Sequence, residues 1–535
     1  MRFKVCILAA GAGTRSGYAD IIHKALLPIG YTTVLTRIIE KFESSTEIVI
    51  AVGAKAEQIE DYISIAHPDR PVKTVLVDRW QGEGIGPGYS LLQCRPYLDC
   101  PFIFTSCDTI VMEEVPEPGY DWVGVAGVED PEPYCMVEVN DRKVSGFWDK
   151  VDPTTFEHAH VDGKNICLDH AFIGMAGVFH VEAFFSSLEN GNKILRNEEW
   201  QVASGLAGLL PHNLTPIPFT WHDTGTTSNY EKTRDELSKC QVLPKISEFT
   251  FIENGKVIKF YKDPEIVTQR VTRAEKLAGL VPEISDLKKN FYAYQYVPGK
   301  LLSEVTDNRS FKNMLETFKK NLWRPLHLDP EERNHFYAVC RKFYEGKTKD
   351  RVKMLLSMNE IDDHDSWING EMVPSLADLI NQIHWDDLCH GQPVLFHGDF
   401  QPENIVFGHQ GMCLLIDWRQ AFGSITNYGD IYYDFAKLYH ALIVNGEVVR
   451  NNQFSTSVDS HSHAFYNFLV PSNLMEFREI FKEFIEENGY SWKKVEILGT
   501  LVFANIAPLH HQSYCEFLYF LSRRLLHRIL KEYAQ

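Results

Sequence analysis

The segment LAAGAGTR at residues 8–15 directly follows a short apolar run at residues 3–8. A strand that ends in a turn containing Gly11 and Gly13 brings backbone N–H groups up to phosphate oxygens, because glycine lacks the Cβ that would block the approach. Arg15 adds a cation to the same turn. The segment therefore predicts a strand followed by a phosphate-binding loop, and the alternative is a purely structural turn.

Apolar runs and helical patterns alternate along the rest of the first half. Further strands are expected at 48–52, 72–77 and 102–105, and helices near 34–42, 56–63 and 89–95. Strands separated by helices predict an α/β fold with a Rossmann-like, mostly parallel sheet. In open sheets of this kind, ligands bind at the carboxyl ends of the strands.

The length of 535 residues predicts two or three domains. The pattern changes around 236–247, where Pro244 interrupts a stretch without a clear period. We therefore expect a first domain over 1–238, a linker over 239–247 and a second domain over 248–535. The second domain has the pattern of an α+β fold, with strands near 248–252, 257–261 and 291–296 followed by mainly helical sequence.

The composition is that of a globular protein with small-molecule substrates. Hydrophobic residues make up 44% of the chain and charged residues 23%, and the formal net charge is −19. A strongly acidic chain argues against a nucleic-acid partner, because binding to phosphate backbones depends on clustered Lys and Arg. We leave open whether the chain forms a homo-oligomer.

Cysteine usage and hydropathy indicate a cytoplasmic protein without membrane insertion. The eleven cysteines are scattered along the chain, their number is odd, and no two of them form a C-x-x-C motif. Neither a disulfide framework nor a zinc site is therefore indicated. The apolar start of the chain is too short for a secretory signal and runs into the glycine turn. The apolar stretch at 498–521 is interrupted by polar residues and predicts a buried helix pair.

Further residues downstream of the glycine turn suit chemistry at a triphosphate. They are Lys24, Asp108 at the end of a strand, the Asp149-Lys150 pair and Asp223 in the segment Trp221 to Gly225. Attack of a phosphate on an α-phosphorus gathers negative charge, which cations and a carboxylate-bound magnesium ion stabilise. In this order and approximate spacing, the elements resemble the sugar-phosphate nucleotidyltransferase family over about the first 235 residues.

The resemblance implies a role for each of these residues. Arg15 and Lys24 would be catalytic, Asp108 and Asp223 would bind magnesium, and Lys150 would bind the phosphate of the substrate. The nucleotide would be bound by Leu8, Ala10, Gly11, Ala12, Gly13, Thr14 and Ser90.

Three departures from the family pattern concern this half. Cys107 stands where many relatives have glycine, Asp149 replaces a glutamate, and residues 86–90 differ from the base-reading segments of thymidylyl- and uridylyltransferases. The compact loop from Arg15 to Lys24 is similar to phosphocholine-type cytidylyltransferases. CTP is therefore the expected nucleotide, with UTP as the alternative.

A second motif, HGDFQPEN at 397–404, is followed by Asp417 in an apolar strand. Phosphoryl transfer from ATP needs an aspartate at the acceptor hydroxyl, an Asn and an Asp for magnesium, and a lysine on the phosphates. The candidate for this lysine is Lys259. In kinases such a lysine pairs with a glutamate on a helix. Glu275 is the candidate glutamate, in a helix expected to begin near Thr272.

From about residue 245 onward the chain resembles the aminoglycoside phosphotransferase and choline kinase superfamily, which implies a kinase-like, two-lobed α+β domain. Gly429, Asp430 and Asp434 also match this family. The resemblance implies that Asp399 is catalytic, that Asn404 and Asp417 bind magnesium, and that Lys259, Glu275 and Tyr296 form the ATP site. No G-x-G-x-x-G loop is present, which excludes an ordinary protein kinase.

Two kinds of acceptor are compatible with the second half. Six aromatic residues, Trp367, Trp385, Trp418, Tyr428, Tyr432 and Tyr433, suit a cage for a quaternary amine such as choline, although aromatic side chains mostly fill cores. Arg419 suits an acidic or hydroxylated acceptor and is the expected substrate-binding residue.

Together the two resemblances imply a bifunctional enzyme. The second half would phosphorylate a small alcohol, sugar or amino alcohol with ATP, and the first half would join the phosphate to a nucleotide from CTP or another NTP. Magnesium would act in both halves, and the product would serve surface-polysaccharide or lipid-headgroup synthesis. The alternatives are a nucleotidyltransferase with a non-catalytic kinase-like domain, and a scaffold.

Overall fold

The structure is a computed structural model that describes residues 2–82, 84–149, 159–161, 164–166, 170–190, 195–196, 199–238, 247–358, 361–408, 413–459 and 463–534. The chain forms two compact units. Unit 1 comprises Met1–Pro264 and Asp286–Ala293, and unit 2 comprises Glu265–Ser285 and Tyr294–Gln535. Of the expected linker, only Ser247 is described, and the domain limits expected from the sequence stay a prediction.

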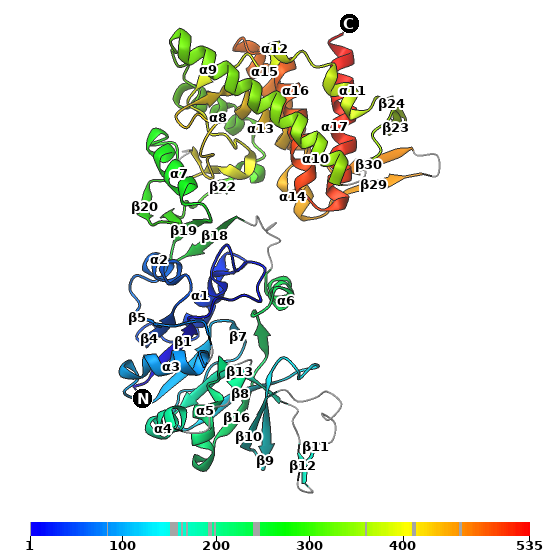
Figure 1. Ribbon diagram of the computed structural model, residues 1–535. Coiled ribbons are helices and arrows are strands. Elements are labelled where there is room, and N and C mark those ends of the chain that lie inside the picture. The colour runs from blue at the N-terminus through cyan, green and yellow to red at the C-terminus, as the bar shows by residue number, and fades with distance from the viewer. Residues whose placement is uncertain are drawn as a thin grey trace. The chain divides into compact units, whose positions relative to one another are not determined.

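A nine-stranded sheet forms the centre of unit 1 (Figure 1). Its order is β10-β9-β13-β6-β1-β4-β5, and β8 pairs with β13 and β16. Strands β6, β1, β4 and β5 run parallel to one another, whereas β13 is antiparallel to β6. The expected Rossmann-like α/β fold is confirmed, with one parallel block at the phosphate loop.

The strands of this sheet are β1 Lys4–Ala9, β4 Glu47–Val52, β5 Val72–Leu76, β6 Phe102–Ser106, β8 Trp122–Gly127, β9 Cys135–Asn140, β10 Lys143–Asp149, β13 His170–Val178 and β16 Thr215–Pro218. The helices of unit 1 are α1 Val34–Ile39, α2 Ala56–Ala66, α3 Pro87–Cys94, α4 Val181–Asn190, α5 Ala203–Leu206 and α6 Thr227–Leu237. Two short strands, β7 Thr109–Val111 and β17 Trp221–Asp223, form a separate antiparallel pair.

Both faces of the sheet are buried because successive side chains of a strand point to opposite faces. In β1, Val5 and Ile7 belong to one apolar core, with side chains of α1 and α2. Cys6 and Leu8 belong to the other core, with side chains of α3, α4 and α5. The continuous apolar run of β1 is thus explained by burial on both sides.

A small sheet also packs into unit 1. Its order is β18-β19-β21-β20, with bounds β18 Glu248–Glu253, β19 Lys256–Tyr261, β20 Ile284–Leu287 and β21 Phe291–Gln295. Tyr62 of α2 places its ring 5.4 Å from that of Phe251 and 6.3 Å from that of Phe291. The backbone N–H of Ile252 donates to Tyr31 O at 2.8 Å. Residues 249–260 therefore share one core with the first 66 residues.

Unit 2 is mainly helical (Figure 1). Its helices are α7 Pro264–Lys276, α8 Asn308–Asn321, α9 Pro330–Arg341, α10 Lys347–Met358, α11 Leu376–Asn381, α12 Trp385–Leu388, α13 Ile431–Ile443, α14 Gly446–Arg450, α15 Ser472–Glu487, α16 Trp492–Ile506 and α17 Gln512–Glu532. Its strands are β22 Lys300–Leu301, β23 Ser366–Ile368, β24 Glu371–Val373, β25 Pro393–Val394, β26 Ile405–Phe407, β27 Cys413–Leu415, β28 Gly429–Asp430, β29 Phe454–Val458 and β30 Ala464–Phe468.

Helix α13 lies at the centre of unit 2. Asp430 caps its N-terminus by accepting a hydrogen bond from the Tyr432 N–H, and almost every residue of the helix is buried. Gly499 of α16 allows a close approach, because a Cβ there would lie 2.4 Å from Cδ1 of Tyr439. Within the described parts of the chain, no helix combines the length and apolarity needed to cross a bilayer.

Glu253 is a buried carboxyl in the core that β18 shares with α2. Burial, with a contribution from Glu40, raises its pKa from 4.5 to about 7. The folded state therefore holds the proton more tightly than the unfolded state, so the free energy of unfolding falls as pH rises from about 4.5 to about 7. The full loss is about 3 kcal/mol.

We expect Glu253→Gln to be more stable than the wild type at pH 8 and to differ little from it at pH 4.5, because the amide cannot ionise. Thermal unfolding midpoints at both pH values measure this. Glu60→Gln, which removes an exposed carboxylate from α2, is the matched control. Equal pH dependence in Glu253→Gln and wild type would contradict the prediction.

Two candidate active sites

The glycine turn follows β1 at the carboxyl edge of the parallel strands. Gly13 has a φ of +66°, in the left-handed region that favours glycine, and the N–H of Ser16 donates to its carbonyl at 2.9 Å. A Cβ at Gly11 would meet no atom within 4 Å. Gly11, Thr14 and Arg15 are exposed, so the turn presents backbone and a cation to solvent.

Asp108 lies at the same edge as the turn, because β1 and β6 are parallel and Leu8 pairs with Ser106. Lys24 Nζ lies 2.6 Å from Asp108 Oδ2. Burial opposes both charges, yet the ion pair raises the pKa of Lys24 and lowers the pKa of Asp108 from their ordinary values. The two groups are therefore charged before any ligand binds.

Asp223 is brought to Asp108 by the β7–β17 pair, in which Asp223 lies opposite Thr109. Its Oδ1 accepts the Gly225 N–H at 2.8 Å and its Oδ2 accepts Asn229 Nδ2 at 2.6 Å. Burial and the nearby Asp108 raise the pKa of Asp223. Two carboxylates in this relation repel one another unless a cation lies between them.

A buried carboxylate organises the second site. Asp434 of α13 accepts hydrogen bonds from the N–H of His397 at 2.8 Å, the N–H of Gly398 at 2.6 Å and Trp323 Nε1 at 3.0 Å. Burial raises its pKa to about 6, while these donors act to lower it. The turn that precedes Asp399 is thereby fixed to α13.

Asp399 itself is held from two sides. Its Oδ1 lies 2.8 Å from Lys437 Nζ, and its Oδ2 accepts Asn404 Nδ2 at 3.1 Å. Asn404 Nδ2 also donates to the Asp399 carbonyl at 2.9 Å. The amide nitrogen of Asn404 is thus used within the loop, and its oxygen is the atom suited to a metal.

Asp417 is connected to the same loop by the Ile416 N–H, which donates to Asn404 O at 2.9 Å. Asp417 has a φ of +58°, which is uncommon for a residue other than glycine and is frequent at functional positions. Asp399, Asn404 and Asp417 are therefore brought together as the sequence predicted.

Both sites have donors that fit magnesium. A Cβ at Gly225 would lie 3.0 Å from one oxygen of Asp108 and 3.0 Å from one oxygen of Asp223, so both carboxylates flank one point. Oxygen ligands from one or two carboxylates, completed by phosphate and water, are the usual protein site for Mg²⁺. Among the described residues, no group of three or more His, Cys, Asp or Glu is arranged to hold a metal ion.

Comparison with known families places both halves. Residues 5–115 match the model of the MobA-like NTP transferase domain, and residues 269–455 match the phosphotransferase enzyme family. The chain joins an NTP transferase domain to a phosphotransferase-family domain. Each matched range contains the glycine turn or the 397–404 loop described above.

Curated relatives match only part of this chain. The bifunctional protein GlmU of Alkaliphilus oremlandii is 36% identical over 111 residues, which cover 20% of this chain and 22% of that protein. GlmU of Methanocaldococcus jannaschii is 32% identical over 140 residues, or 25% of this chain and 33% of that protein. The chain thus spans a third or less of these relatives.

Solved structures similar to this chain include the CTP:phosphocholine cytidylyltransferase of Streptococcus pneumoniae. It is 17% identical, with 44% of this chain and 100% of that chain covered and a TM-score of 0.33. A UTP-bound UGPase of Acinetobacter baumannii is 16% identical, with 44% and 93% covered and a TM-score of 0.35.

Other residues predicted for the NTP transferase site are placed as follows. Leu8 and Ala10 are buried at the end of β1, and Ala12 is half-buried in the turn. Ser90 is buried in α3 and donates to Gly86 O at 3.1 Å, a bond within the helix's first turn. Lys150 lies outside the described residues, so its place relative to Asp108 stays a prediction.

One expectation for the phosphotransferase domain is wrong. The helix that carries Glu275 begins at Pro264 and not near Thr272, because proline is favoured in the first turn, where its missing N–H has no partner to lose. Glu275 is therefore in the last turn and exposed. Lys259 is buried in β19, and its Nζ donates to Thr250 Oγ1 at 3.0 Å.

The remaining predicted residues are Tyr296, Arg419 and the six aromatic residues considered for a cage. Tyr296 follows β21 and is half exposed. Arg419 donates through Nη1 to the Tyr433 hydroxyl at 3.2 Å. The six aromatic residues do not form one cage, since Trp418 is fully buried with its Nε1 donating to Arg270 O, whereas Trp367 is exposed on β23.

Sequence reasoning missed two residues and undervalued one. Lys437 pairs with Asp399, and Arg273 of α7 is buried with its guanidinium donating to the carbonyls of Phe396 and Asn427. Asp434 was recognised only as part of a matching motif. The segment 431–443 is apolar enough to predict a buried helix, and Lys437 is a lysine within it, less than one helical turn after Asp434. A lysine in a buried helix is the signal that could have indicated a charged partner.

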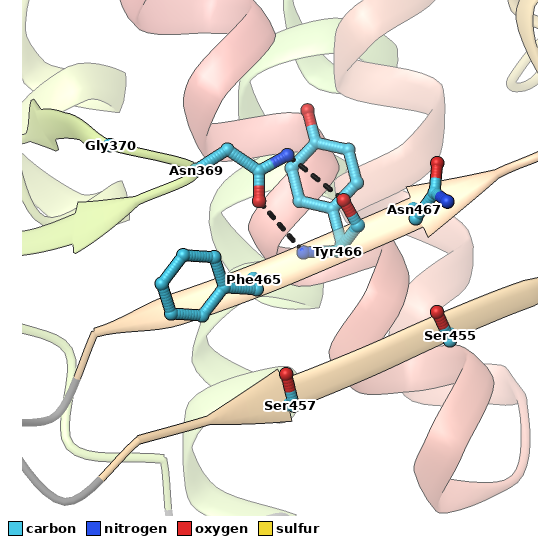
Figure 2. A pocket seen from close by; sticks show the side chains of 7 residues that line it. All are labelled: Asn369, Gly370, Ser455, Ser457, Phe465, Tyr466 and Asn467. Carbon is cyan, nitrogen blue, oxygen red and sulfur yellow. Dashed lines mark hydrogen bonds between the residues drawn. The ribbon is translucent and has the colours of Figure 1, made fainter.

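A hollow elsewhere in unit 2 contains none of the predicted residues. Figure 2 shows it over β29 and β30, where Asn369 Nδ2 donates to Tyr466 O at 2.9 Å and the Tyr466 N–H donates back to Asn369 Oδ1 at 2.8 Å. Its volume is about 500 Å³, and the rings of Phe465 and Tyr466 line it together with polar side chains. Size alone therefore does not locate the chemistry.

We expect Asp434→Ala to destabilise the protein by about 3 kcal/mol or more, because it leaves buried N–H donors without an acceptor. Trp323→Phe removes one donor and keeps the carboxylate on the loop, so its effect on transfer from ATP should be smaller. Thermal denaturation and ATP consumption measure both variants. An Asp434→Ala protein with wild-type stability and activity would show that the loop is fixed by other contacts.

Proposed function

We propose that the protein is a bifunctional cytoplasmic enzyme. Its phosphotransferase domain phosphorylates a small alcohol, sugar or amino alcohol with ATP. Its NTP transferase domain then joins that phosphate to a nucleotide, with CTP favoured, and releases pyrophosphate. The observation that carries the proposal is that each half has acidic groups held by neighbouring side chains: Asp108 is paired with Lys24 in the first half, and Asp399 is paired with Lys437 in the second.

In the NTP transferase domain, the glycine turn and Arg15 bind the triphosphate. Lys24, kept protonated by Asp108, neutralises charge that develops on the leaving pyrophosphate. Asp108 and Asp223 would hold magnesium, which would supply positive charge at the α-phosphate. Lys150 is the expected partner of the attacking phosphate.

In the phosphotransferase domain, Asp399 orients the acceptor hydroxyl and takes its proton. Asn404 and Asp417 would hold magnesium, which would supply positive charge to the ATP phosphates. Lys259 is the expected ligand of those phosphates. Asp434 acts on the loop and not on the substrate, so it is a positioning residue.

The product would be a nucleotide-activated alcohol for surface-polysaccharide or lipid-headgroup assembly. The alternative is a nucleotidyltransferase, with UTP or another NTP, whose kinase-like half binds substrate or regulates. The joint presence of Asp399, Asn404 and Asp417 favours a catalytically active kinase-like domain, because a non-catalytic domain has no need to keep all three.

The order of reactions is tested by crossed variants. Asp223→Asn should lower pyrophosphate release by about 10²-fold or more while ATP consumption continues. Asp417→Asn should lower ATP consumption by a similar factor and, because no phosphorylated alcohol forms, should also lower pyrophosphate release from the free alcohol. With Asp417→Asn, supplying the phosphorylated alcohol should restore nucleotide product. ADP, pyrophosphate and product mass are measured with a panel of alcohols, ATP and CTP. Loss of ATP consumption in Asp223→Asn, or loss of pyrophosphate release in Asp417→Asn supplied with the phosphorylated alcohol, would contradict two independent sites.

The base of the second nucleotide is a separate prediction. With the phosphorylated alcohol as acceptor, kcat/KM for CTP should exceed that for UTP, ATP and GTP, as expected from the compact Arg15-to-Lys24 loop. Pyrophosphate release with each NTP measures this. Turnover with UTP and none with CTP would refute CTP while leaving the two-step reaction intact.

A further inference from the structure

A group of cations surrounds the acceptor side of Asp399 in unit 2. Lys437 lies one helical turn after Tyr433 on α13, so both point from the same face of the helix. Arg419 donates to the Tyr433 hydroxyl at 3.2 Å, and Lys437 Nζ lies 2.8 Å from Asp399 Oδ1. Lys347 opens α10 and reaches the same region. Three positive charges therefore gather beside one proposed catalytic carboxylate.

The pKa of the Tyr433 hydroxyl is affected by these cations. Burial by itself would raise the pKa of Tyr433, yet Arg419, Lys347 and Lys437 lower it below its ordinary value. Burial lowers the pKa of Lys347, and Arg419 and Lys437 lower it further. The cations are thus close enough to repel one another.

The ring of Phe343 connects two of the cations. Lys347 Nζ lies 4.8 Å from its centroid, and the Arg419 guanidinium carbon lies 5.4 Å from the same centroid. Tyr433 completes the arrangement, with ring centroids 4.8 Å apart from Phe343. The rings of Phe343 and Tyr433 are therefore already in contact with the protein's own cations, which makes them unfavourable partners for a quaternary amine.

The charges are only partly compensated. Lys437 is paired with Asp399, but across the described ranges no carboxylate lies within ion-pair distance of Lys347 or Arg419. The acidic neighbour Glu345 is instead paired with Arg341 and Lys349. Two half-buried cations without a counter-ion are unfavourable unless an anion binds between them.

We propose that the acceptor alcohol of the phosphotransferase domain carries an anionic group, a carboxylate or a phosphate ester, bound by Arg419 and Lys347. This rests on the proposed phosphorylation at Asp399. The acceptor oxygen forms a bond to the γ-phosphorus of ATP, the bond from that phosphorus to the bridging oxygen breaks, ADP leaves, and the hydroxyl proton passes to Asp399. Arg419 suits the anion because its planar guanidinium can donate two parallel hydrogen bonds.

The test uses the full-length protein, ATP and alcohols that differ in one substituent: glycerol, glycerate, glycerol 3-phosphate and choline. We expect kcat/KM for an anionic acceptor to exceed that for glycerol or choline by about 10-fold or more, as for a charge-assisted contact. Glycerate against glycerol 3-phosphate distinguishes carboxylate from phosphate. A preference for glycerol or choline would overturn the inference while leaving the proposed phosphorylation intact.

Charge-removing variants give the second readout. Lys347→Met and Arg419→Gln should each raise KM for the anionic acceptor by about 10-fold more than they raise KM for glycerol. Lys349→Met is the matched control, because it removes an exposed lysine of the same helix that pairs with Glu345. Equal losses for anionic and neutral acceptors would overturn the inference.

If none of the alcohols consumes ATP, the proposed phosphorylation fails for this panel, and equilibrium binding still tests the anion site. Calorimetry should then detect glycerate or glycerol 3-phosphate binding to the wild type and not to the Lys347→Met, Arg419→Gln double variant. Absence of binding to the wild type, or binding that survives in a folded double variant, would overturn the site.

Discussion

The buried carboxylate of Asp434 is the interaction on which the second site depends. It accepts the N–H groups of His397 and Gly398, so the backbone before Asp399 has one orientation relative to α13. Gly398 is required there, because its φ is +88° and a Cβ would lie 2.6 Å from both Phe396 Cε2 and Arg419 Cβ. From this fixed turn follow the positions of Asp399 and, through the loop, of Asn404.

In the first site, too, a buried carboxylate is held in place by a buried partner, here Asp108 by Lys24. Asp108 and Lys24 oppose the cost of burial by neutralising each other, and the nearby Asp223 is made a weaker acid. In both sites the charged groups are oriented by neighbours that are buried with them. Such preorganisation is effective in catalysis because the protein does not need to rearrange when charge develops in the transition state.

Features set by local sequence were predictable. The strand and glycine turn at 3–15 and the loop at 397–404 are short, and their residue types have one main physical use. The start of the helix at Pro264 was missed because Glu275 was read as an early helical residue, whereas the proline signal lies 11 residues earlier. The positions of Lys347 and Lys437 were not predictable from the sequence, because only the folded chain brings helices α10 and α13 close to Arg419.

The core shared by α2 and β18 has a consequence for how such chains evolve and are engineered. Phe251 and Phe291 come from the sequence that resembles a kinase, yet they pack on Tyr62 of helix α2, which covers the nucleotidyltransferase sheet. A cut between the two resemblances would leave an apolar face on the first fragment and a strand pair without its support on the second. A functional first half therefore has to include the strands up to Ala293, and a recombination point between residues 238 and 248 would divide this core.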